Sequence, residues 1–353
     1  MNIKRVAFGQ IFDGRVVEKT ILTNSHGHRV ALMNWGASLL EVDVPDREGK
    51  LANVNCTFAD LDPYLRPHPG FGSSIGRFCN RIAYGKFTID GVDHQVTVNL
   101  GEHCLHGGDV NFSHLYWETV RSDQQRIDDV PTAIVRYRLV SPDGDEGFPG
   151  ELTAEAEYRW NDNDELTVEY SATTDAPTHV NLTNHAYWNL AGVGSGTALD
   201  HVAVIHANEV LAVDEDLIPT GATKTVEGTP FDFLHAETFR ERIDQLPATN
   251  GYDHCYVIAG QAGKLRPAAR VTSPKSGRFL EVETTQPGMQ LYLGNNLPGN
   301  EASAGVGRHE AFCLETQHYP DAPNHAHFPS TLLRPGETMK ETTVHRFGVE
   351  GQS

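Results

Sequence analysis

Five short segments of the chain concentrate side chains that donate, accept or exchange protons. In chain order they are residues 76–87, 105–108, 180–190, 251–254 and 312–317. Glu315 in the last segment is the most informative residue, because Phe312 and Leu314 place it at the end of an apolar strand. An unpaired carboxylate in such surroundings costs several kcal/mol. We therefore expect Glu315 to have a function other than packing.

Each segment has an ordinary structural explanation when it is taken alone. A lone Arg81 is usually an ion-pair partner, and His106 before two glycines is typical of a turn. Together, however, the segments supply directional hydrogen-bonding groups and flat rings, which binding of a carbohydrate requires. His185 and Glu315 would add acid–base chemistry near neutral pH. The combination predicts a sugar site.

Signatures of several other kinds of site are missing from the sequence. Two HxH pairs, at residues 26–28 and 325–327, lie in polar loops without a third ligand. A structural or catalytic metal needs at least three protein ligands. No HExxH, GxxxxGK[ST] or strand-following GxGxxG pattern is present, and no GxSxG marks a nucleophilic serine. We therefore expect neither a metal nor an organic cofactor.

Alternating apolar and polar residues predict the strands that must position these segments. Residues 152–160 and 166–172 alternate in this way around a turn-forming Asn-Asp-Asn-Asp run. The pattern indicates an antiparallel hairpin with one buried face. A second hairpin is predicted between 86–89 and 95–98, through an Asp-Gly dipeptide.

Further strands, and little helix, are predicted along the rest of the chain. The best short helix is 235–244, where apolar residues lie four apart. The additional strands are expected at 29–33, 39–44, 133–140, 202–205, 279–284, 290–293, 311–314 and 343–349. Many short strands punctuated by 33 Gly and 19 Pro favour an all-β fold, a large antiparallel β-sandwich or barrel. No linker interrupts the pattern, so residues 1–353 are interpreted as a single domain.

Segment 180–190 is also interpreted as a strand, with one side lining the site. Its three Asn are unusual for a strand that only serves a core. Successive side chains of a strand point to opposite faces. At most one of Tyr187 and Trp188 is therefore expected to face the site, and the other should be core.

The composition limits the kinds of binding partner and the cellular compartment that we expect for this protein. Apolar residues make up 39% of the chain and charged residues 21%, with a formal charge of −19. Such an acidic protein repels nucleic acids and anionic membranes, so a small molecule is the expected partner. The five cysteines are scattered, and no signal peptide or membrane span is evident. A cytoplasmic monomer or homodimer is the expectation.

The five polar segments, in this order, resemble the aldose 1-epimerases, or galactose mutarotases, over nearly the whole chain. Residues 76–87 look like the GR-x-x-NRI-x-x-G-x-F segment of that family, and 105–108 match its LHGG. Residues 183–190 are similar to its TNH-x-Y-[FW]-NL. Its PG-x-Q and LE-x-Q elements correspond to 287–290 and 314–317. One such motif would be weak evidence, but five in order are strong.

The resemblance implies a galactose mutarotase-like β-supersandwich that acts on free hexoses such as galactose and glucose. By the family pattern, Glu315 is the general base at the C1 hydroxyl and His185 is the general acid at the ring oxygen. The ring opens, the C1–C2 bond rotates, and the ring closes to either anomer. The family pattern also implies five substrate-holding residues: Asn80, Arg81, His106, Asp253 and Gln290.

Some positions depart from the family pattern, and three other functions stay open. Gln286 stands where an acid is common, Asn296 stands where an aromatic residue often lies, and residues 101–104 replace a run richer in Asn. A binding protein without turnover is one alternative, and a hexose-6-phosphate epimerase is another. A glycoside hydrolase would use Asp253 and Glu315 as its carboxylate pair.

Overall fold

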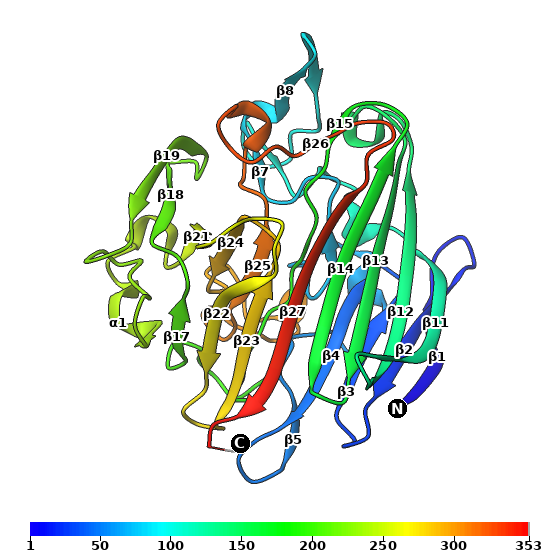
Figure 1. Ribbon diagram of the computed structural model, residues 1–353, viewed down its shortest axis with the longest axis vertical. Coiled ribbons are helices and arrows are strands. Elements are labelled where there is room, and N and C mark those ends of the chain that lie inside the picture. Colours follow the sequence, from blue (N-terminus) through cyan, green and yellow to red (C-terminus); the bar gives the residue numbers. More distant parts are fainter. Residues whose placement is uncertain (352–353) are drawn as a thin grey trace.

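The computed structural model describes residues 1–351 and consists mainly of three large antiparallel sheets (Figure 1). The first has the order β1 (Asn2–Gln10), β2 (Val16–Thr23), β3 (Arg29–Met33), β4 (Ser38–Pro45) and β5 (Leu51–Asn53). The second and largest has nine strands. Their order is β11 (Glu118–Ile127), β12 (Val130–Ser141), β13 (Leu152–Asn161), β14 (Glu165–Thr174), β27 (Met339–Val349), β23 (Arg278–Thr284), β22 (Arg266–Thr272), β17 (Val202–Ile205) and β20 (Glu237–Thr238).

The third sheet carries Asp253, Gln290 and Glu315, three of the seven predicted site residues. Its order is β19 (Pro219–Thr225), β18 (Glu209–Val213), β21 (Asp253–Val257), β24 (Gly288–Tyr292) and β25 (Cys313–Gln317). Four two-stranded ladders complete the strands. They pair β6 (Ser74–Ile75) with β16 (Thr183–Asn184), β7 (Arg81–Ile82) with β10 (Cys104–Leu105), β8 (Lys86–Ile89) with β9 (Val92–Gln95), and β15 (Thr178–His179) with β26 (Leu332–Leu333).

Helices are few and short in residues 1–351. One α-helix, α1 (Arg240–Ile243), is present, and none has the length and apolarity needed to cross a membrane. The rest are single 3₁₀ turns: Asp62–Leu65, Ala83–Gly85, Phe112–His114, Asp145–Gly147, Pro247–Thr249, Glu301–Ser303 and Ala322–Asn324.

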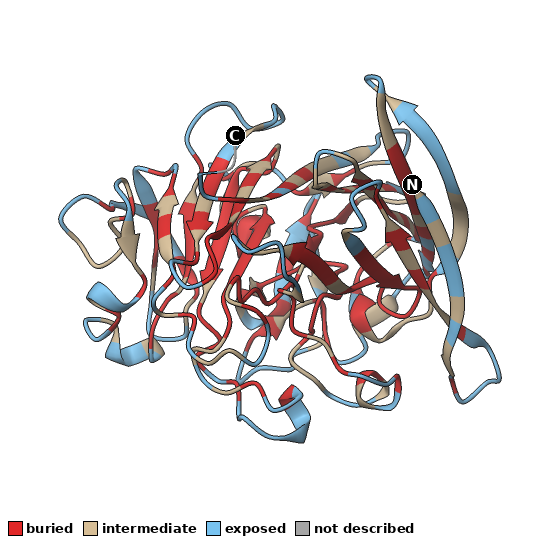
Figure 2. Cartoon of the chain, turned by 90° about the horizontal axis from the view of Figure 1, so that it is seen from below, coloured by how far each residue is buried: buried red, intermediate tan, exposed pale blue. Residues whose placement is uncertain are grey.

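One large apolar cluster joins the three sheets. It includes Leu32 of β3, Tyr158 of β13 and Leu291 of β24, all fully buried. Figure 2 shows dense burial in the interior, and along β14 buried residues alternate with partly exposed ones. Alternation is expected of strands with one face in a core and the other in water. The predicted antiparallel β-sandwich is confirmed.

The hairpins and most of the predicted strands are also confirmed, with corrections at their ends. β13 and β14 pair from Leu152↔Thr174 to Trp160↔Leu166. In the second hairpin Ile89 pairs with Val92, so the returning strand starts at Val92 rather than at residue 95. A two-residue turn returns the chain to pairing immediately. The strand expected at 311–314 lies two residues later, as β25.

Two predictions about local structure were wrong. The helix expected at 235–244 is limited to α1, because Glu237–Thr238 pairs with β17 as an edge strand. Of segment 180–190 only Thr183–Asn184 is a strand, in β16. Amide side chains in that segment bond backbone groups elsewhere and so replace a regular ladder: Asn184 donates to Gly72 O and Asn189 donates to Glu310 O.

Candidate active site

Strand pairing in the third sheet places several polar side chains on the same face as Glu315. Glu315 of β25 lies opposite Gln290 of β24, and Cys313 lies opposite Tyr292. Asp253 of β21 lies opposite Tyr292 on the other side. Directly paired residues, and residues two apart on one strand, share a face of a sheet. These five side chains therefore form one wall.

Segment 180–190 brings His185 against that wall. Its backbone N–H donates to Ser73 O at 2.9 Å, and its carbonyl accepts from Gly72 N at 2.9 Å. The ring of His185 stacks on that of Tyr187, with centroids 4.8 Å apart and planes 7° apart. The Tyr187 hydroxyl donates to Pro69 O at 3.1 Å. Both the backbone and the ring plane of His185 are thus fixed.

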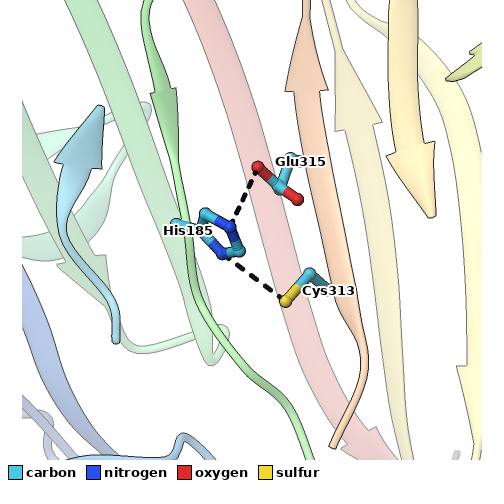
Figure 3. Close-up of side chains that lie close together, drawn as sticks. All are labelled: His185, Cys313 and Glu315. Carbon is cyan, nitrogen blue, oxygen red and sulfur yellow. Dashed lines mark hydrogen bonds and ion pairs between the residues drawn. The ribbon is translucent and has the colours of Figure 1, made fainter. Parts of the chain in front are cut away.

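His185 and Glu315 form a buried acid–base pair (Figure 3). Nε2 of His185 is 3.5 Å from Oε2 of Glu315, and only 5% of His185 and 2% of Glu315 are exposed. Nδ1 of the same ring is 3.6 Å from Sγ of Cys313. The imidazole therefore lies between a carboxyl group and a thiol.

A cavity of about 380 Å³ opens over this pair, which is within the usual range for small-molecule sites. Polar groups and aromatic rings share its lining. The lining residues are His68, Pro69, Asn80, Arg81, Leu100, Leu105, His106, His185, Tyr187, Asp253, Gln290, Tyr292, Asn296 and Glu315. All seven predicted site residues are among them.

A hydrogen-bonded network orders the polar lining. Gln290 Nε2 donates to Asp253 Oδ1 at 2.6 Å, and Nη2 of Arg81 is 3.5 Å from Asp253 Oδ2. Nη1 of Arg81 also donates to Asn80 Oδ1 at 3.3 Å. Among the described lining residues Arg81 is the sole fixed cation. Its charge is therefore shared with a carboxylate rather than free for an anionic ligand.

His106 is held as a neutral hydrogen-bond donor. Its Nδ1 accepts the backbone N–H of Asn80 at 3.2 Å, so its proton lies on Nε2. Burial, helped by the neighbouring His185 and Arg81, keeps the pKa of His106 well below its usual value. A neutral imidazole with Nε2–H can donate to a hydroxyl or a ring oxygen.

Burial shifts the pKa values of the two catalytic candidates in opposite directions. Desolvation lowers the pKa of His185 to about 4. Desolvation, reinforced by the charge of Asp253, raises the pKa of Glu315 well above its ordinary value, against a smaller opposing effect of Arg81. Burial therefore disfavours the charged form of each group, and it favours a proton on Glu315 over a proton on His185.

The same cluster offers nitrogen, sulfur and oxygen atoms to a metal. The donor atoms of His185, Cys313 and Glu315 lie within 4.8 Å of one another. The thiol and the carboxyl group, however, contact different nitrogens of one ring, whose lone pairs diverge. An ion bound to one nitrogen would lie away from the ligand at the other, so the arrangement suits proton transfer better than coordination.

The structure decides which aromatic residue of segment 180–190 faces the site. Tyr187 lines the cavity, whereas Trp188 is fully buried in the large core. The three Asn of the segment do not line the cavity, contrary to the interpretation of the segment as a wall rich in hydrogen-bonding groups. They serve backbone groups instead.

Sequence reasoning missed several lining residues. Tyr292 could have been found, because it lies two residues from Gln290 on the same strand. Cys313 contacts His185 without lining the cavity, and it lies two residues from Glu315 on β25. His68 and Pro69 follow a single 3₁₀ turn, and nothing local signals that they approach the site.

Comparison with known proteins identifies the family of the chain. The family model described as aldose 1-epimerase matches residues 18–346. The chain belongs to the aldose 1-epimerase family. It is 42% identical to the galactose mutarotase of Bos taurus over 352 residues, 99% of each chain. It is 36% identical to the aldose 1-epimerase of Escherichia coli K12 over 346 residues, 96% of this chain and 97% of that one.

Solved structures of the aldose 1-epimerase family have the same fold. The crystal structure of galactose 1-epimerase from Lactobacillus acidophilus superposes with a TM-score of 0.87 at 26% identity, covering 99% of both chains. The protein is therefore an isomerase of the aldose 1-epimerase type, and its substrate is a sugar.

Proposed function

We propose that this epimerase interconverts the α and β anomers of free hexoses, galactose and glucose first, through Glu315 and His185. The observation that carries the proposal is the 3.5 Å contact between His185 Nε2 and Glu315 Oε2 at the cavity wall. Mutarotation needs one group to take a proton and another to deliver one, on two oxygens of the same ring. A catalytic group works best within about 2.6–3.2 Å of its oxygen.

The proton count of the pair matches both halves of the reaction. For ring opening, ionised Glu315 takes the proton of the C1 hydroxyl while protonated His185 gives one to the ring oxygen. Afterwards Glu315 is protonated and His185 is neutral, which is the state that burial favours in the empty cavity. Ring closure uses the two groups in reverse. The pair therefore carries one proton throughout, and no net charge enters the buried site.

The open aldehyde stays bound while the C1–C2 bond rotates by a half turn. We propose that Asn80, Arg81 and His106 hold the sugar on one side, and that Asp253 and Gln290 hold it from the third sheet. Each of the five lines the cavity with a polar side chain. Tyr187 and Tyr292 offer ring surfaces to the C–H face of the sugar.

The alternatives fit the cavity less well. A hexose 6-phosphate would need several cations, yet Arg81 is already paired with Asp253 among the described lining residues. A protein that only binds a sugar has no use for a buried acid–base pair that costs desolvation. A glycoside hydrolase would release the aglycone of an aryl glycoside, so incubation with such a glycoside distinguishes it.

Polarimetry on freshly dissolved α-D-galactose and α-D-glucose tests the proposal. Wild type should accelerate the decay of optical rotation, and Glu315→Gln and His185→Gln should each lower kcat by roughly 10²–10⁴-fold. Circular dichroism and thermal unfolding should verify that both variants fold. Near-normal turnover in a folded variant would assign the acid or the base to another residue.

A further inference from the structure

The thiol of Cys313 contacts the nitrogen of His185 that does not face Glu315. Cys313 and Glu315 are two residues apart on β25 and so project from the same face of the sheet. Sγ of Cys313 is 3.6 Å from Nδ1, while the carboxylate is 3.5 Å from Nε2 (Figure 3). One strand therefore supplies a partner to each ring nitrogen.

The ring of His185 has little freedom to turn away from these two partners. It stacks on Tyr187 with nearly parallel planes, and the hydroxyl of Tyr187 is tied to Pro69 O. The backbone of His185 is bonded on both sides, to Ser73 and Gly72. The position of the proton on the neutral ring is thus decided by Cys313 and Glu315.

We propose that Cys313 is a positioning residue whose sulfur accepts a hydrogen bond from Nδ1–H of His185 and so leaves Nε2 as the nitrogen that exchanges protons. This inference rests on the proposed function, in which His185 is the acid. Glu315 faces Nε2 at 3.5 Å and burial favours its protonated form, so Nε2 is the nitrogen placed to accept a proton from Glu315 and the ring proton belongs on Nδ1. Sulfur is the acceptor available at that position.

A thiol has a different chemical effect from the carboxylate that commonly supports a catalytic histidine. A carboxylate stabilises the imidazolium, whereas a thiol is an uncharged, weak acceptor. Burial, reinforced by the nearby Glu315, raises the pKa of Cys313 well above its usual value, so the thiol stays uncharged at neutral pH. Cys313 therefore orients His185 without weakening it as an acid.

Nitrogen NMR of the protein with ¹⁵N-labelled histidine tests the tautomer directly. His185→Gln identifies the signals of His185 by their loss. In wild type at neutral pH, Nδ1 of His185 should show the shift of a protonated nitrogen and Nε2 that of an unprotonated one. In Cys313→Ala the two signals should move toward a mixture of tautomers. An unprotonated Nδ1 in wild type would overturn the proposal.

Kinetics of matched cysteine variants provide the second test. Cys313→Ala should lower kcat about tenfold with little change in KM, the lower end of what loss of a histidine-orienting group costs. Cys313→Ser should recover most of that loss, because its hydroxyl oxygen can accept from Nδ1–H. Cys56→Ala is the control, because Cys56 is a buried thiol in the same smaller apolar cluster as Cys313, separate from the large core.

Failure of the role of Cys313 and failure of the proposed function would give different kinetic results. Wild-type kcat in Cys313→Ala, or a serine variant no faster than the alanine variant, would overturn the role of Cys313 while His185→Gln stays inactive. Substantial activity in folded His185→Gln would instead overturn the proposed function, and the role of Cys313 with it.

Discussion

At the scale of single residues, the proposed mechanism depends on two buried ionisable groups, His185 and Glu315, whose charged forms are disfavoured before the substrate binds. Burial costs the charged forms of His185 and Glu315 several kcal/mol each, and their pKa values move accordingly. A sugar hydroxyl and a ring oxygen then give the pair something to exchange protons with. Desolvation disfavours both charged forms. It therefore makes protonated His185 a stronger acid and ionised Glu315 a stronger base.

The pH dependence of kcat/KM should reflect these shifted values. Below a pH of about 4, His185 takes up a second proton and the pair loses its base. At high pH, above the raised pKa of Glu315, the pair loses its proton and with it the acid. We expect a plateau across neutral pH with the acidic limb near 4.

Polarimetry against buffer blanks at each pH measures this profile, because mutarotation also proceeds without enzyme. An acidic limb near 6.5, the ordinary pKa of histidine, would contradict it. Such a limb would mean that His185 is not desolvated in the free enzyme.

At the scale of elements, Asn181 joins three segments of the site. Its backbone carbonyl accepts from Cys79 N at 2.8 Å, beside the segment that carries Asn80 and Arg81. Its side chain accepts from His318 N at 2.9 Å and donates to His318 O at 3.2 Å, just after β25. Asn181 thus supplies hydrogen bonds to backbone groups that no regular strand pairing satisfies.

Asn181→Ala should therefore cost both stability and activity. Leaving the partly buried N–H and C=O of His318 without these partners should lower the free energy of unfolding by about 2 kcal/mol. Misplacement of Glu315 relative to Arg81 should also lower kcat. Urea unfolding and polarimetry measure the two effects. Exposed Asn163→Ala in the β13–β14 turn is the control and should change stability by less than about 0.5 kcal/mol.

At the scale of the whole molecule, three sheets share a core that contains several buried histidines. We propose that the chain is a single domain, because apolar residues of all three sheets belong to one cluster. His179, His201 and His345 lie outside the cavity lining, and burial lowers the pKa of each to about 4. Their protonation is therefore linked to global unfolding.

These histidines should make the fold sensitive to mild acid. Their folded pKa values lie below the unfolded value of about 6.5, so the unfolded state binds protons first as the pH falls. Stability should be complete above pH 6.5 and decline toward pH 4, by up to about 1.4 kcal/mol per pH unit for each histidine. Urea unfolding at several pH values tests this, and His179→Gln should reduce the slope. Stability that does not change between pH 4.5 and 6.5 would refute it.

Much of this protein could be predicted before the structure because the relevant signals are local. The alternation in β13 and β14 reports one buried face directly, and the order of the polar segments carries the family resemblance. Glu315 could be singled out because a carboxylate on an apolar strand is costly wherever the strand lies. The seven residues that the family resemblance implied all line one cavity.

What only the tertiary structure decided depends on contacts between distant segments. The sequence does not say that Tyr187 rather than Trp188 faces the cavity, since both readings satisfy the alternation of a strand. Segment 180–190 looked like a strand because its neighbours in sequence suit one. Its Asn side chains instead bond carbonyls over 100 residues away. The contact between Cys313 and His185 likewise joins two segments 128 residues apart. Strand register and side-chain bonds of this kind are set by packing of the whole chain, and no local pattern encodes them.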